Sequence, residues 1–76
     1  MAMTFTHRPY ASEEIKEWVA RFKGSRVIVE TNKRIVIKCP DMSVAETMAR
    51  QIHRMGYPSD VRKGIRSNDG YIQAWF

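Results

Sequence analysis

Hydrophobic residues recur at helical spacing over residues 12–23. The apolar positions fall at i, i+3, i+4 and i+7, and they are Ile15, Trp18, Val19 and Phe22. This spacing places them on one face of a helix. Acidic residues stand in the first turn of the segment and basic residues in its last turn, and both placements suit the helix dipole. A glycine follows directly and can adopt the left-handed conformation that ends a helix.

Two runs rich in β-branched residues follow, residues 25–31 and 34–39, and together they predict a hairpin. A shift of one residue in the pairing exchanges the two faces of the ribbon. A two-residue loop would mix charged and apolar residues on both faces, whereas a loop of odd length centred on Asn32 separates them, so we predict the odd loop. Its core face carries Val27, Val29, Ile35, Ile37 and Cys39, and its other face carries Arg26, Ile28, Glu30, Arg34, Val36 and Lys38.

A second helix is predicted to begin at Ser43. Ser43 and Glu46 have the spacing of a capping box, in which each side chain accepts a free backbone N–H of the first turn. The buried stripe consists of Val44, Met48, Ile52 and Met55, flanked by Ala45 and Ala49. A glycine and then a proline follow this stripe and end the helix.

The last segment predicts a second hairpin, with strands over residues 59–66 and 71–76. The residues between them are rich in turn formers, and a four-residue turn pairs Arg66 with Tyr71. One face of this hairpin then carries Val61, Ile65, Ile72, Ala74 and Phe76, with Lys63 as an odd member. The opposite face carries Arg62, Gly64, Arg66, Tyr71, Gln73 and Trp75.

The order helix, hairpin, helix, hairpin predicts an α+β fold of two layers, αββαββ. Two helices cover one face of a four-stranded, mainly antiparallel sheet, and the other face stays open. We expect residues 11–76 to form this single domain and residues 1–10 to form a partly ordered N-terminal arm. If residues 3–7 add a strand, the fold becomes a ferredoxin-like variant. The order of the strands in the sheet stays open at this point.

Length and composition limit the function classes. A chain of 76 residues has room for one core. Cys39 is its only cysteine, which excludes an internal disulfide and favours a reducing compartment, so we expect a cytoplasmic protein. Residues 1–10 lack the apolar run of a signal peptide, and no stretch has the length of a membrane span. The net charge of +5 suits a polyanionic partner and equally suits simple solubility.

Residues that could carry chemistry are few and scattered. Cys39, His7 and His53 are the only soft metal ligands, and no two of them have ligand spacing. No phosphate-binding loop occurs, because every glycine stands alone. We also find no acid–base pair and no nucleophile with an adjacent base. The sequence therefore predicts a protein that is not an enzyme and that uses no metal ion or cofactor.

The two predicted registers together define one surface on the open side of the sheet. It displays Arg26, Arg34, Lys38, Arg62, Arg66, Tyr71, Gln73 and Trp75, with Glu30 as its only acid. Tyrosine, tryptophan and arginine are enriched at protein interfaces, so we predict a binding module that uses this face. The face would be covered by residues 1–10 or by a second copy in a homodimer, or it would bind an acidic protein.

The alternative partner for this face is single-stranded DNA or RNA. Aromatic rings stack on bases, and arginine and lysine hold phosphates. A second basic cluster, on the outer side of the second helix, consists of Arg50, His53 and Arg54. It is either solvated helix surface or a set of secondary phosphate contacts that position a nucleic acid.

Overall fold

The computed structural model describes residues 11–65 and 68–76. The elements are α1 (Ala11–Arg21), β1 (Arg26–Glu30), β2 (Arg34–Cys39), α2 (Met42–Arg54), β3 (Ser59–Lys63) and β4 (Gly70–Trp75). The predicted α+β fold, with two helices and two hairpins, is confirmed. The predicted N-terminal arm and the extra strand over residues 3–7 lie outside the described residues, and so does Arg66.

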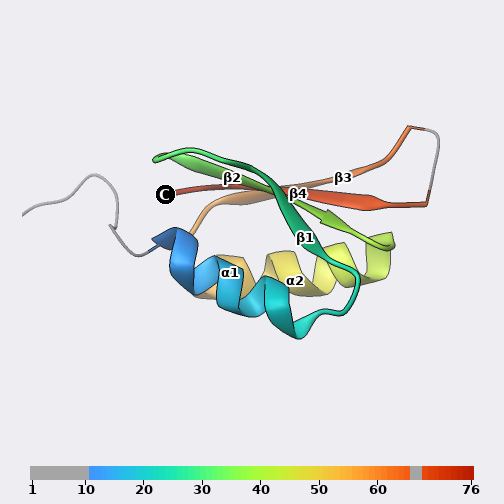
Figure 1. The fold of residues 1–76 in the computed structure, drawn as a ribbon, viewed down its shortest axis with the longest axis horizontal. Helices are drawn as coiled ribbons and strands as arrows, with labels where there is room; N and C mark the ends of the chain where they lie inside the picture. Colours follow the sequence, from blue (N-terminus) through green and yellow to red (C-terminus); the bar gives the residue numbers. More distant parts are fainter. Residues whose placement is uncertain (1–10, 66–67) are drawn as a thin grey trace, which may run out of the picture.

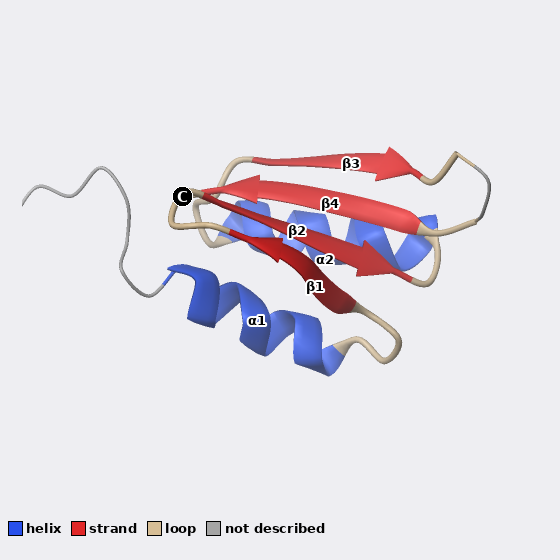
Figure 2. Cartoon of the chain, turned by 45° about the horizontal axis from the view of Figure 1, so that its top comes forward, coloured by secondary structure: helices blue, strands red, loops and turns tan. Residues whose placement is uncertain are grey.

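The strands form one antiparallel sheet in the order β1-β2-β4-β3. The second strand of each hairpin therefore lies in the centre, and the two hairpins join through the β2–β4 pair. Both helices lie on the same side of this sheet, as predicted (Figures 1 and 2). Neither helix of the described part has the length and apolar character needed to cross a membrane.

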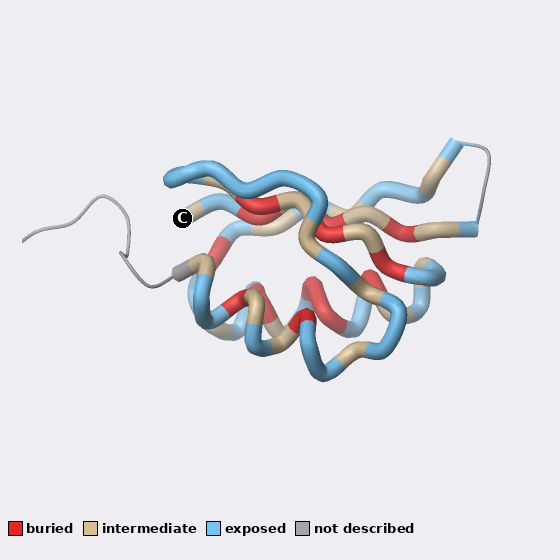
Figure 3. The backbone as a smooth tube through the Cα atoms, in the orientation of Figure 1, coloured by how far each residue is buried: buried red, intermediate tan, exposed pale blue. Residues whose placement is uncertain are grey.

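The core fills the space between the helix layer and the sheet (Figure 3). The helices contribute Ile15, Val19, Ala45, Met48, Ala49 and Ile52. The sheet contributes Ile35, Ile37, Cys39, Ile72 and Ala74, and Tyr57 joins them from the segment between α2 and β3. Alternate residues of the two central strands are thus buried against the helices, which leaves the residues between them on the opposite side.

The odd loop predicted for the first hairpin is wrong. The N–H of Thr31 donates to the carbonyl oxygen of Arg34 at 2.8 Å, which closes a two-residue loop over residues 32–33. The Thr31 hydroxyl stabilises this loop locally, because its Oγ1 accepts the N–H groups of Lys33 and Arg34 at 3.2 and 3.0 Å. A threonine that satisfies two loop amides thus favours the short connection.

A β-bulge resolves the conflict that the short loop creates. Val29 lies opposite Val36, yet Val27 lies opposite Ile37, so Ile28 is an extra residue in β1. Val27 therefore returns to the helix side, while Val29 faces the open side, contrary to the prediction. Glu30 lies opposite the buried Ile35, on the helix side, so its predicted place on the open face is also wrong.

The predicted capping box of the second helix is wrong as well. The helix begins at Met42, and Asp41 is its N-cap. Asp41 Oδ1 accepts the N–H of Val44 at 2.9 Å, so the carboxylate caps the helix in place of the Ser43 hydroxyl. The predicted left-handed glycines after the two helices are confirmed, with φ of 87° at Gly24 and 98° at Gly56.

The first strand of the second hairpin is shorter than predicted, and the second begins and ends one residue earlier. Lys63 lies opposite Gly70, and the N–H of Gly64 donates to the carbonyl oxygen of Asp69 at 2.8 Å. Tyr71 lies opposite Arg62, so the predicted pairing of Tyr71 with Arg66 is wrong. The register differs by an even number of residues, and the paired residues therefore keep their predicted faces. Ile65, predicted to share a strand face with Val61 and Ile72, lies beyond the end of β3 and is fully exposed.

Candidate binding surface on the open sheet face

The side of the sheet turned away from the helices, called the open face below, carries a row of cations and one aromatic ring. Arg26, Lys38, Tyr71 and Arg62 lie next to one another across β1, β2, β4 and β3. The strand order creates this row, because it places Tyr71 on a central strand between Lys38 and Arg62. All four side chains belong to the side of the sheet opposite the buried residues.

The next two rows, towards the C-terminal end of β4, have a different composition. Val29, Val36, Gln73 and Asp60 form the second row across the sheet. In the third row, Arg34 lies opposite Trp75 on the central strands. Trp75 is 39% exposed, although it is a large aromatic residue.

An exposed apolar strip borders these rows on the β1 edge. Ile28 is 44% exposed and Val29 is 37% exposed, and Val36 lies beside Val29 on the neighbouring strand. The two-residue loop creates this strip, because its register places Val29 opposite Val36 on the open face. The open face therefore combines a basic, aromatic part with a small apolar part.

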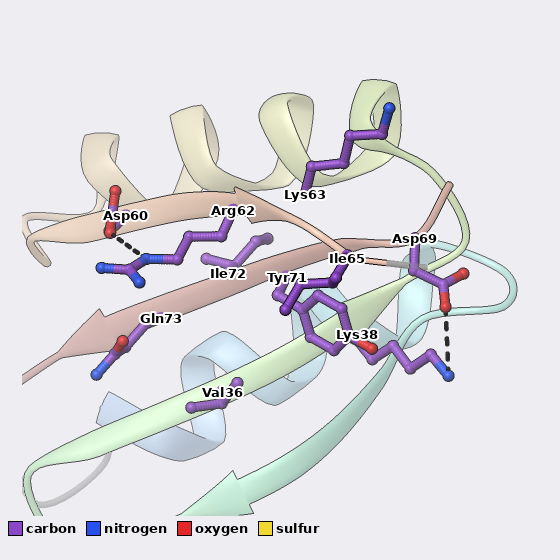
Figure 4. Close-up of a pocket in the computed structure, with 11 residues that line it drawn as sticks. Val36, Lys38, Asp60, Arg62, Lys63, Ile65, Asp69, Tyr71, Ile72 and Gln73 are labelled. Carbon is purple, nitrogen blue, oxygen red and sulfur yellow. Dashed lines mark hydrogen bonds and ion pairs between the residues drawn. The ribbon is translucent and has the colours of Figure 1, made fainter. Parts of the chain in front are cut away.

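Two carboxylates form ion pairs with cations of the open face (Figure 4). Lys38 Nζ lies 3.4 Å from Asp69 Oδ2, and Arg62 Nε lies 3.3 Å from Asp60 Oδ2. Both pairs are partly exposed, so each contributes little to folding stability. Arg26 and Arg34 form no ion pair within the described part of the chain.

A pocket of about 760 Å³ lies beside Tyr71. Lys38 and Arg62 bring positive charge to its wall, and Asp60 and Asp69 bring negative charge. Gln73 and Ile65 also line it. Figure 4 shows the ring of Tyr71 between the side chains of Lys38 and Arg62. The pocket thus offers one flat ring surrounded by groups of both signs.

The structure brings most of the predicted site residues together on the open face. These are Arg26, Arg34, Lys38, Arg62, Tyr71, Gln73 and Trp75. Arg66 lies outside the described residues. Sequence reasoning missed Asp60 and Asp69, although the alternation of β3 already places Asp60 on the same side as Arg62.

The second predicted cluster does not belong to this surface. Arg50, His53 and Arg54 are exposed residues of α2, in the helix layer. Arg50 and His53 line a separate hollow of about 380 Å³ with Ser59 and Val61. A ligand on the open face would have to pass around the edge strand β3 to reach these side chains.

The groups that sequence analysis considered for chemistry lie apart from one another. Cys39 is fully buried, and this burial raises the pKa of its thiol, which keeps the sulfur neutral. His53 is exposed on α2, and His7 lies outside the described residues. Among residues 11–65 and 68–76, no group of three His, Cys, Asp or Glu side chains could hold a metal ion.

Comparisons with known proteins identify no relative of this chain. No protein-family model, no curated protein and no solved structure matches the chain. The function is therefore inferred from the chemistry and geometry of the open face.

Proposed function

We propose that this protein is a non-catalytic binding module that holds an anionic macromolecule on its open face. The row of Arg26, Lys38, Tyr71 and Arg62 across all four strands supports this proposal most strongly. Arg34 and Trp75 extend the same combination of cation and ring by one further row. A basic surface with exposed aromatic side chains favours partners that carry negative charge.

The edges of the sheet are poor places for a partner strand. The bulge at Ile28 interrupts the regular pairing pattern of β1. At the other edge, β3 carries Asp60, Arg62 and Lys63, and charged residues protect an edge strand from pairing. Binding through the face is therefore the better supported mode.

Self-association through the face is less well supported. Two copies meeting face to face would bring their cation rows close together, and like charges at an interface are unfavourable. Asp60 and Asp69 could offset only part of this repulsion, because each already lies against a cation of its own chain. An anionic partner avoids this repulsion. The apolar strip of Ile28 and Val29 would suit an acidic protein in particular.

Neutralising single arginines on the open face tests the proposal. We would measure binding of labelled polyglutamate and of a labelled single-stranded oligonucleotide by fluorescence anisotropy. The variants Arg26→Gln and Arg34→Gln should each weaken binding and reduce its dependence on salt. Lys23→Gln is the matched control, because it removes the same charge from the exposed turn after α1.

The control separates a specific surface from general charge attraction. If Lys23→Gln weakens binding as much as the arginine variants, net charge alone explains it and the open face has no special role. If the unmodified protein binds neither polyanion, the proposal fails. The cytoplasmic location predicted from the single cysteine would be compatible with a protein or RNA partner, and it stays a prediction.

A further inference from the structure

The two central strands repeat one pair of side chains along their length. Lys38 lies opposite Tyr71, and Arg34 lies opposite Trp75, so a cation and a ring are cross-strand neighbours in both places. The rings are four residues apart on β4, which corresponds to about 13 Å along the strand. A polymer that alternates flat bases with phosphates presents the same kind of repeat.

The pocket beside Tyr71 distinguishes between the two kinds of anionic partner. It contains Asp60 and Asp69 as well as its cations. A glutamate-rich peptide would bring carboxylates against these two acids and be repelled. A nucleotide would place a neutral base on the ring, where carboxylates accept hydrogen bonds from base amino groups. The Gln73 amide, also in the pocket wall, can donate to and accept from a base edge.

The size of the pocket and the place of its cations fit this arrangement. Its volume of about 760 Å³ is within the range of sites that bind small molecules, about 300–1,000 Å³. Lys38 and Arg62 lie in the pocket wall on either side of Tyr71, and Arg26 and Arg34 lie elsewhere on the open face. Phosphates can thus meet cations at the rim while a base occupies the centre.

We infer that the partner of the open face is a single-stranded nucleic acid, with one base stacked on Tyr71 in the pocket and another stacked on Trp75. This inference rests on the function proposed above. Stacking of a base on an aromatic side chain contributes about 1–3 kcal/mol, which corresponds to a loss of about 5-fold to 150-fold in affinity when the ring is removed. A duplex keeps its bases stacked on one another and offers no free base face to either ring.

Paired substitutions of the two rings test the inference. Binding of a labelled oligonucleotide of about 12 nucleotides would be measured by fluorescence anisotropy at several salt concentrations. Tyr71→Ala and Trp75→Ala should each lower the affinity by about 5-fold to 150-fold. Tyr71→Phe and Trp75→Phe keep a stacking ring and should retain most of the affinity. Circular dichroism would check that each variant is folded. If the variant at one ring does not fold, the variant at the other ring still tests the inference.

Two further probes separate the failure of this inference from the failure of the proposed function. A duplex of the same sequence should bind more weakly than the single strand, and polyglutamate should bind more weakly than either. If polyglutamate binds well and the single strand does not, the partner is an acidic protein and only the nucleic-acid inference fails. If the single strand binds but all four ring variants keep full affinity, stacking is excluded. If no probe binds, both proposals fail.

Discussion

Glu30 of β1 lies 2.7 Å from Lys16 of α1, with a carboxylate oxygen against the lysine Nζ. This ion pair joins the edge strand to the helix layer. It exists because the two-residue loop places Glu30 opposite Ile35, on the helix side, and the bulge at Ile28 returns Val27 to the same side. The same loop removes the only acid that the sequence had suggested for the open face. A change of one residue in the length of the loop therefore changes the charge of the candidate surface.

The Lys16–Glu30 pair should make stability depend on pH at both ends of the scale. The hydrogen bond from Lys16 lowers the pKa of Glu30 below 4.5. The stabilisation by the ionised Glu30 is therefore complete above pH 4.5 and is lost as the pH falls through the lowered pKa. The hydrogen bond to Glu30 raises the pKa of Lys16 above 10.5, so its contribution is lost as the pH rises through the raised pKa. Thermal unfolding of Glu30→Gln should show a weaker loss of stability in acid.

Glu13 supplies a matched control for this prediction. Its carboxylate lies 3.6 Å from the same Lys16 Nζ, and Glu13→Gln removes the same charge. We expect Glu13→Gln to leave the acid dependence closer to that of the unmodified protein. Equal effects of the two substitutions would show that Lys16 responds to general negative charge and that the short contact with Glu30 has no special role.

Gly70 should not tolerate a methyl group, because β4 begins directly against α2. A Cβ at this position would lie 2.6 Å from Ala45 Cβ and 2.9 Å from the carbonyl oxygen of Asp41. We expect Gly70→Ala to lower the free energy of unfolding by about 1–3 kcal/mol through overpacking. Chemical denaturation would measure the loss.

A second substitution identifies the cause of that loss. Ala45→Gly removes the nearest atom, although a glycine inside a helix itself costs about 1 kcal/mol. The double variant Gly70→Ala with Ala45→Gly should therefore lose less stability than the sum of the two single variants. Simple additivity would contradict the proposed contact between α2 and β4.

The sequence predicted those parts of the fold that follow from repeating patterns. Both helices follow from apolar positions at helical spacing, and β4 keeps its predicted faces because its alternation from Tyr71 to Trp75 is regular. The prediction for the first hairpin was wrong because two local preferences compete there. The Thr31 hydroxyl favours a short loop, whereas the apolar alternation of β1 favours an odd one, and a bulge satisfies both.

The candidate site was predictable to the same extent as its strands. Tyr71, Gln73 and Trp75 share a face by alternation alone. The row that joins Tyr71 to Lys38 depends on the pairing of β2 with β4, a long-range contact with no signal in either hairpin. The pocket beside Tyr71 depends on where β3 ends, and the boundaries of strands are set by pairing more than by composition.

The N-cap of α2 gives a prediction that distinguishes the contribution of Asp41 to stability from that of Ser43. Asp41→Ala removes the carboxylate that accepts the Val44 N–H, and we expect a loss of about 0.5–2 kcal/mol in the free energy of unfolding. Ser43→Ala should cost less, because Ser43 lies within the first turn. Asp41→Asn should retain most of the stability, since asparagine is also a good cap. A larger loss for Ser43→Ala than for Asp41→Ala would restore the capping box that the sequence suggested.

Deleting Ile28 should leave the fold intact and increase self-association. Val27 already lies opposite Ile37 and Val29 opposite Val36, so joining them directly gives a strand with regular alternation and no change of face. Ile28 is 44% exposed, and its removal therefore leaves little empty space in the core. The strand would then lose its bulge, and a regular, exposed edge strand pairs more readily with another chain.

Circular dichroism and sedimentation velocity at micromolar concentration would test this prediction. The deletion variant should keep the spectrum of the unmodified protein and show more dimer or larger species. Deleting Val36 instead should unfold the protein, because β2 pairs on both sides and a shift by one residue would turn Ile37 away from the core. A folded deletion variant of Ile28 that stays as monomeric as the unmodified protein would show that the bulge does not protect the edge.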